Sequence, residues 1–156
     1  HVVLWPADGR ELAPPYTVRA TLEKRAGRLH EGVGLIFGAS ALEEPESGQT
    51  YSYFLVRGDG SYLVKRRRGA ETPVVRDWTR HPAIQRDDEE QRGRPNQLEV
   101  RVTAAEVAFL VNGALVERIP AEALDLRGRA GVRAAHDVQL AVTGFTVDPA
   151  VPDSVP

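Results

Sequence analysis

Four aromatic residues in the middle of the chain could bind a sugar ring. Flat side chains pack against the C–H faces of sugars, and polar side chains beside them bond to the hydroxyl groups. The aromatic candidates are Tyr51, Tyr53, Tyr62 and Trp78, and the polar candidates are Arg66, Arg76, Asp77 and His81. Aromatic residues on strands also fill hydrophobic cores, so a purely structural interpretation of the same side chains stays open.

Carboxylates that could hydrolyse a glycoside occur in two loop-like stretches. A glycosidase needs two of them facing each other across a cleft. The acidic residues in these stretches are Glu43, Glu44, Glu46, Asp87, Asp88, Glu89 and Glu90. Because runs of charge are typical of solvated loops, the sequence assigns no catalytic residue.

The sequence shows no spacing typical of a metal, phosphate-loop or nucleotide site. The chain has no Cys, and its four histidines are far apart. They are His1, His30, His81 and His136. We therefore predict no cofactor, with one alternative: a structural calcium ion held by oxygen atoms of Asp8, Asp137 and Asp148.

Two short motifs have an ordinary explanation beside a functional one. Arg57-Gly58-Asp59 spells an integrin-recognition tripeptide, but a tight turn favours Gly and Asp for backbone reasons. The basic run at 65–68 would place alternate side chains on opposite faces of a strand, which divides its charge. It is interpreted as a solvated strand end, and contact with an anionic glycan or phosphate is the alternative.

The composition is that of one globular domain. The chain has 156 residues, 42% hydrophobic and 27% charged, and the net charge of −2 argues against a nucleic-acid binder. It has no apolar run long enough to span a membrane. Its 14 Gly and 11 Pro punctuate the chain at short intervals, which favours many short strands over a few helices.

Alternating apolar residues predict strands along most of the chain. Hairpins are predicted over 51–68, around the turn at 57–60, and over 98–119, around Asn112-Gly113. One helical turn could lie within 120–126. We expect an all-β, two-sheet antiparallel jelly-roll sandwich of roughly ten or eleven strands. It would comprise a lead-in with an edge strand (1–14), the sandwich (15–148) and a Pro-rich tail or linker (149–156).

An ordered series of segments adds a family resemblance. The series runs through Gly34-Leu35-Ile36-Phe37, the hairpin at 51–62, Asp77-Trp78-Thr79, the segment 96–113, and Gly144-Phe145-Thr146-Val147. It resembles the concanavalin A-like, laminin-G-like jelly rolls of bacterial exported proteins. Their neighbours include the 3-keto-disaccharide hydrolase domains, which are related to family 16 glycoside hydrolases. The resemblance covers about 15–147.

Two departures from the enzymes lower the expectation of catalysis. The Glu-x-Asp-x-x-Glu string of family 16 is missing, and Val33-Gly34-Leu35 stands where keto-disaccharide hydrolases have Asn-Ser-Gly. The chain also opens at His1, as a processed or excised piece would. We predict a non-catalytic module of an exported bacterial protein, extracellular or periplasmic, with carbohydrate as the candidate ligand. The alternatives are a hydrolase of the keto-disaccharide type and a structural or interaction domain that packs against other domains of a longer chain.

Overall fold

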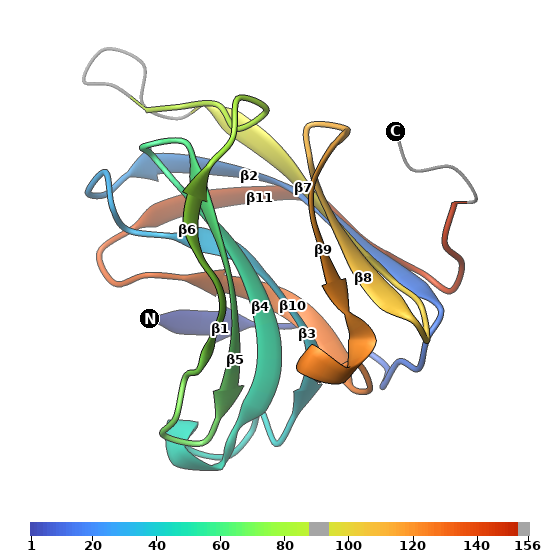
Figure 1. The fold of residues 1–156 in the computed structure, drawn as a ribbon. Helices are drawn as coiled ribbons and strands as arrows, with labels where there is room; N and C mark the ends of the chain where they lie inside the picture. The colour runs from blue at the N-terminus through green and yellow to red at the C-terminus, as the bar shows by residue number, and fades with distance from the viewer. Residues whose placement is uncertain (88–93, 153–156) are drawn as a thin grey trace.

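The computed structural model describes residues 1–87 and 94–152, which form two antiparallel β-sheets facing each other (Figure 1). The six-stranded sheet has the order β1-β10-β3-β4-β5-β6, and the five-stranded sheet has the order β11-β2-β7-β8-β9. Together they make eleven strands, within the roughly ten or eleven that the sequence predicts. The strands are β1 (Val2–Leu4), β2 (Tyr16–Ala26), β3 (Val33–Ser40), β4 (Thr50–Arg57), β5 (Ser61–Arg68), β6 (Val74–Arg80), β7 (Pro95–Val102), β8 (Glu106–Val111), β9 (Ala114–Pro120), β10 (Arg129–Ala134) and β11 (Gln139–Asp148).

Both predicted hairpins are present. In the first, β4 pairs with β5 from Thr50↔Arg68 to Arg57↔Ser61 without a register shift. In the second, Asn112 and Gly113 connect β8 to β9 with φ of 51° and 84°. Positive φ at both positions is what a type I′ turn requires, and its twist matches that of the strands it joins.

Helix is confined to two short 3-10 turns in the described residues. They are η1 (Glu46–Gly48) and η2 (Ala121–Ala123), and η2 falls inside the stretch predicted to hold one helical turn. None of the described helices is long and apolar enough to cross a membrane. The strand β2 continues to Ala26, into a polar stretch of the chain. Of the acidic residues in the second loop-like stretch, Asp88, Glu89 and Glu90 lie outside the described residues.

The main core lies between the two sheets. Alternate residues of β2, such as Tyr16 and Val18, point into it, and so do residues of β3, β4, β7 and β8. Phe54 lies near its centre, with its ring 5.0 Å from the ring of Phe109 and 6.2 Å from that of Tyr62. Burying the apolar side chains of this core, aromatic and aliphatic, is the main source of stability in a sandwich that has no disulfide.

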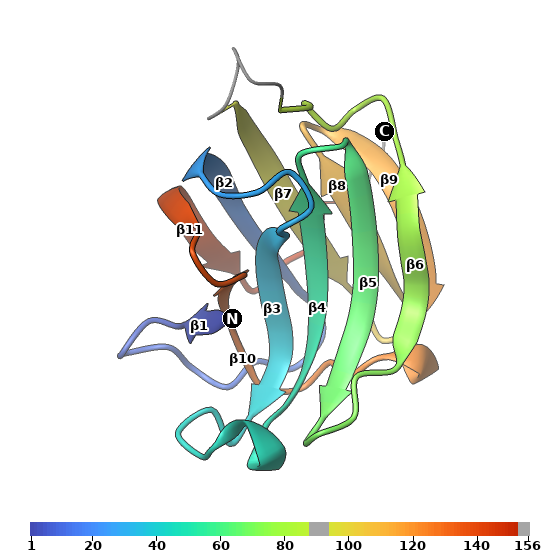
Figure 2. The same cartoon turned by 90° about the vertical axis from the view of Figure 1, so that its left-hand side faces the viewer.

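A second hydrophobic cluster covers the opposite, outer face of the six-stranded sheet, which Figure 2 shows with β7, β8 and β9 behind it. It is built from side chains of β3, β4 and β5 and of the loop after β3, and Val3, Trp5 and Trp78 pack against it. Its buried members are Ile36, Ala39, Leu42, Tyr51, Tyr53, Leu55 and Leu63. The middle strands of this sheet are therefore buried on both faces.

Gly34 is required by the close packing of β3 against β4. A Cβ atom at this position would lie 1.8 Å from the carbonyl oxygen of Phe54. At Gly48, in η1, the nearest heavy atom to such a Cβ is 3.2 Å away.

We predict that Gly34→Ala lowers the free energy of unfolding by about 3 kcal/mol or more, or prevents folding. Gly48→Ala should cost less than about 1 kcal/mol. Urea denaturation measures both, and equal costs would contradict the packing described.

Candidate functional site

The six-stranded sheet divides the residues that the sequence proposes as one site. Tyr62 lies in the core between the sheets and donates a hydrogen bond to Glu117 (2.9 Å). Arg76 forms an ion pair with the same Glu117 (2.9 Å). Arg66 bonds to Asp125 (2.9 Å). These residues tie the six-stranded sheet to β9 and to the segment after η2, so their polar groups already have partners.

Tyr51 and Tyr53 lie on the outer face, but neither forms an open platform. Their side chains are 0% and 2% exposed, and Tyr62 is also only 2% exposed. The expectation of a flat tyrosine surface for sugar stacking is therefore wrong in its geometry. His81 lies in the loop after β6, where its Nδ1 accepts a hydrogen bond from the backbone N–H of Ala83 (3.1 Å). Of the four aromatic candidates, only Trp78 keeps part of its side chain at the surface.

Five side chains lie over the hydrophobic cluster on this face. We call them the outer layer: Arg57, Lys65, Arg67, Trp78 and Arg133. They come from four strands, β4, β5, β6 and β10, so only the assembled sheet brings them together. Four are cations and one is an indole, a combination that suits a polar ligand with a flat apolar face.

Arg133 crosses from β10 to the tyrosines of β4. Its Cα pairs with Gly34 of β3, which has no side chain to obstruct the crossing. The guanidinium carbon lies 4.5 Å from the centre of the Tyr53 ring, and Nε donates to the Tyr51 hydroxyl at 3.2 Å. The two tyrosine rings meet edge to face, with centroids 5.4 Å apart. The hydrogen bond to Tyr51 and the ring of Tyr53 thus fix the position of the Arg133 guanidinium.

Lys65 and Arg67 lie beside the same tyrosines on β5. The register pairs Tyr53 with Lys65 and Tyr51 with Arg67. Partial burial lowers the pKa of the Lys65 amino group, and the positive charges of Arg133 and Arg67 lower it further, while Asp77 opposes them. Arg67 donates from Nη1 to the carbonyl of Gly69 (2.8 Å). The basic run at 65–68 therefore divides between the two faces as predicted, with Arg66 on the core side.

Trp78 forms the other end of the outer layer. The Arg57 guanidinium lies over its indole, 4.1 Å from the ring centroid. The indole also packs beside Leu55 and close to the backbone of Gly32. Arg57 in turn bonds to Asp59 at 3.1 Å. Trp78 is fixed in orientation by these contacts while remaining partly exposed.

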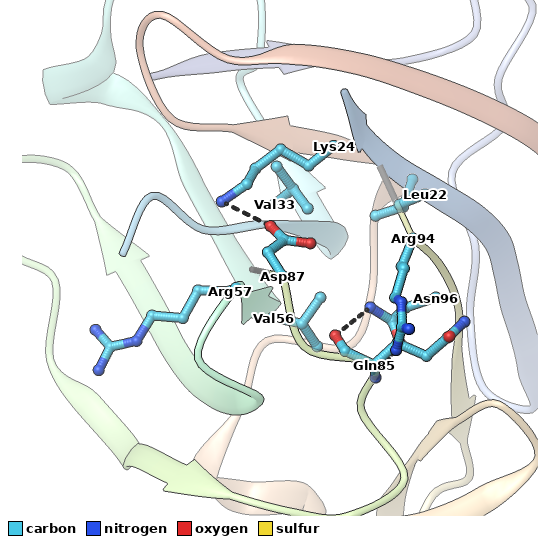
Figure 3. A pocket seen from close by; sticks show the side chains of 10 residues that line it. Leu22, Lys24, Val33, Val56, Arg57, Gln85, Asp87, Arg94 and Asn96 are labelled. Carbon is cyan, nitrogen blue, oxygen red and sulfur yellow. Dashed lines mark hydrogen bonds and ion pairs between the residues drawn. The ribbon is translucent and has the colours of Figure 1, made fainter. Parts of the chain in front are cut away.

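A small cavity between the sheets, near the β4–β5 turn, is too small to be the ligand site (Figure 3). Its volume is ≈ 20 Å³, room for about one water molecule. Lys24 and Asp87 point toward each other in its wall, 3.5 Å apart, and both are largely buried. Lys24 also donates to the carbonyls of Arg28 (2.6 Å) and Glu31 (3.2 Å). The pair closes this end of the sandwich.

Two of the larger hollows lie where the two sheets separate on the side of β1 and β11. One of ≈ 460 Å³ is lined in part by Leu12 and Phe145, and one of ≈ 260 Å³ by Leu4 and Val142. They are mainly apolar, with Asp8 and Arg10 in the lining of the first and His136 and Asp137 in that of the second. No group of three or more Asp, Glu or His side chains that could hold a metal ion exists within 1–87 and 94–152. Calcium at Asp8, Asp137 and Asp148 thus gains no support and stays a prediction.

Comparisons with known proteins support the fold class. No protein-family model and no curated protein sequence matches the chain. Among solved structures, the carbohydrate-binding module CBM66 from Bacillus subtilis matches with a TM-score of 0.71 at 10% identity, covering 94% of this chain and 80% of that one. A Bacillus subtilis protein of unknown function with a galectin-like fold gives 0.70 at 14% identity, covering 96% and 77%. Sheep galectin-11, in complex with glycerol, gives 0.63 at 12%, covering 94% and 99%.

At these identities the likeness shows the fold alone. The chain is a two-sheet sandwich of the concanavalin A-like class, as the resemblance implies. The narrower resemblance, to laminin-G-like domains of exported bacterial proteins and to keto-disaccharide hydrolases, stays a prediction.

Sequence reasoning did not include Arg57, Lys65, Arg67 or Arg133 in the proposed sugar site, and it considered the run at 65–68 only as an alternative contact for an anionic glycan or phosphate. A signal was present for Lys65 and Arg67, because the hairpin register places them opposite Tyr53 and Tyr51. Arg133 had no such signal. It lies far along the chain and reaches the tyrosines only because β10 pairs with β3.

The Lys24–Asp87 pair yields a stability prediction. Lys24→Met leaves the Asp87 carboxylate buried without its cation, and we expect the free energy of unfolding to fall by about 3 to 5 kcal/mol. Adding Asp87→Leu should recover part of this loss, because replacing both members of a buried pair by apolar residues is often nearly neutral. Urea denaturation of the single and double variants measures the coupling. A single-variant cost below about 1 kcal/mol would contradict a structural role.

The Arg57-Gly58-Asp59 turn yields a pH prediction. Burial alone would raise the pKa of the Asp59 carboxyl, but hydrogen bonds from Arg57 and Ser61 outweigh it and hold the pKa below its ordinary value. The ionised form therefore stabilises the fold above about pH 4, the unfolded pKa, and this stabilisation is lost as the pH falls through the folded value.

Asp59→Asn should consequently cost about 1.5 to 3 kcal/mol at neutral pH and less in acid. The measurement is urea denaturation of both proteins at pH 7 and pH 3. A difference that does not shrink on acidification would refute this assignment for Asp59.

Proposed function

We propose that this domain is a non-catalytic carbohydrate-binding module whose ligand lies on the outer face of the six-stranded sheet. The observation that carries the proposal is the outer layer itself, a partly exposed indole in a row with arginine and lysine side chains. An indole packs against the C–H face of a sugar, and fork-shaped arginine donors can bond to pairs of oxygen atoms. The solved structures with this fold include a carbohydrate-binding module and galectins, which agrees with this assignment.

The outer layer is rigid enough to recognise a ligand without large rearrangement. Arg57 is fixed by Asp59 and by the Trp78 ring, and Arg133 is fixed by Tyr51 and Tyr53. Side chains held in this way lose little conformational freedom on binding, so more of the contact energy appears as affinity. The buried tyrosines contribute by supporting Arg133, a role different from the stacking predicted for them.

The wider setting is proposed from the family resemblance. We infer that the domain belongs to an exported bacterial protein and acts outside the cytoplasm, where polymeric carbohydrate is encountered. Packing against other domains of a longer chain is compatible with this arrangement. The apolar hollows beside β1 and β11 lie away from the outer layer and leave that face free.

The proposal predicts that Trp78→Ala abolishes or strongly weakens glycan binding. A glycan array identifies ligands of the unaltered domain, and calorimetry with the best ligand gives the affinity. We expect a loss of about ten-fold or more, because stacking and the orientation of Arg57 are both removed. Trp5→Ala is the matched control, since Trp5 packs against the same cluster from the β1 side. It should lower stability yet retain binding.

Three results would count against the proposal. An array without any ligand would refute glycan binding, and equal losses in both tryptophan variants would refute the assigned face. Turnover of a bound glycan into smaller products would favour the hydrolase alternative instead.

A further inference from the structure

The outer faces of the two sheets differ in how their charges are paired. On the five-stranded sheet, Arg19 bonds to Glu99 at 2.7 Å, Arg101 contacts the same Glu99, and Arg118 bonds to Glu106 at 2.5 Å. Each of these cations has an acidic partner on the same face. Such pairing neutralises a surface and leaves little attraction for a charged ligand.

Three cations of the outer layer have no such partner. Within the described part of the chain, no carboxylate lies within 4.0 Å of a side-chain nitrogen of Lys65, Arg67 or Arg133. The pKa of the Lys65 amino group is lowered mainly by its partial burial, and the positive charges of Arg133 and Arg67 lower it as well, while Asp77 opposes them. Gathering three positive charges over two buried tyrosines costs stability, which an anion bound at this place would restore.

Arg67 provides a second observation that points to an anion as the ligand. It is 8% exposed, and its Nε is the one buried side-chain nitrogen or oxygen in the described residues that lacks a hydrogen-bond partner. Leaving a buried charged donor unpaired is costly, and such groups are rare unless something binds to them. Among the described residues, this guanidinium donates a hydrogen bond from Nη1 to the carbonyl of Gly69.

We propose that the ligand is an acidic carbohydrate, whose carboxylate or sulfate group binds among Lys65, Arg67 and Arg133 while a neighbouring sugar ring packs toward Trp78. This inference rests on the proposed function and specifies the class of glycan. Arginine suits the role because its planar donors match the paired oxygens of a carboxylate or sulfate. Lys65 adds a mobile point charge on the β5 side.

A sugar acid fits this face better than a nucleic acid does. The three cations cover one part of one sheet, whereas the whole chain has a net charge of −2. A nucleic-acid backbone is contacted through a broad basic surface that tracks many phosphates. The tyrosines under the cations are buried and offer no faces for base stacking.

The test compares ligands that differ only in the acidic group. Oligogalacturonate and its methyl ester form one such pair, and heparin oligosaccharide with its desulfated, N-acetylated and carboxyl-reduced form makes another. We expect the acidic member of at least one pair to bind about ten-fold or more tightly by calorimetry. Its affinity should fall as salt is raised, because the attraction is between opposite charges.

Substitutions then locate the acidic group. Arg133→Met and Lys65→Gln should each lower the affinity for the acidic ligand by about ten-fold. The difference in affinity between the acidic ligand and its neutral partner should become smaller as a result. Arg133→Lys keeps the charge and should retain part of the affinity. Arg25→Ala and Arg118→Ala, both on the five-stranded sheet, remove the same charge from the chain and should alter binding less than about two-fold. Thermal denaturation confirms that each variant is folded.

The outcomes separate this inference from the proposed function. If the acidic and neutral members bind equally and Arg133 variants are unaffected, the acidic-ligand inference is wrong while glycan binding stands. If no glycan of either kind binds, the proposed function fails as well. Tighter binding of a single-stranded oligonucleotide than of any acidic glycan would overturn the carbohydrate assignment.

Discussion

The middle strands of the six-stranded sheet are covered by side chains on both faces. One face packs against the five-stranded sheet through Phe54 and its aromatic neighbours, and the other is covered by the cluster that contains Tyr51 and Tyr53. Most antiparallel sheets in a sandwich leave their outer face to water. Here a hydrophobic cluster covers the outer face. A polar side chain on this face must therefore pack on top of the cluster or extend beyond it.

This constraint explains why the outer layer consists mainly of long basic side chains. Long basic side chains can cover apolar surface with their aliphatic stems while keeping the charged end near water. Lys65 extends beside the tyrosines and stays partly exposed, whereas Arg67 is buried beside Tyr51. Arg133 and Arg57 place their guanidinium groups over the rings of Tyr53 and Trp78. These side chains lie close together because neighbouring strands of a sheet lie close together. No acidic residue of the described chain forms an ion pair with Lys65, Arg67 or Arg133. The resulting face is positive on a protein with a small net negative charge.

The hairpin of β4 and β5 illustrates how much the sequence predicts. Alternation and turn residues fixed its position and register, and the division of the basic run between two faces followed from strand geometry. The same reasoning treated Tyr51 and Tyr53 as candidates for exposure because a strand pattern does not reveal whether its second face is covered. What covers them, Arg133 from β10 and the packing of Trp5, comes from the two ends of the chain.

By itself, the sequence determined the class of the fold, because local turn chemistry and the two-residue period of a strand are written in neighbouring residues. It also determined which residue types are available for chemistry. Only the tertiary structure decided which of them meet. Tyr62, Arg66 and Arg76 were directed to the core side and found partners there, whereas Arg133 reached the tyrosines through pairing of strands nearly a hundred residues apart. Such pairing depends on the order of strands in a sheet, and that order is settled by the burial of whole faces rather than by any local pattern.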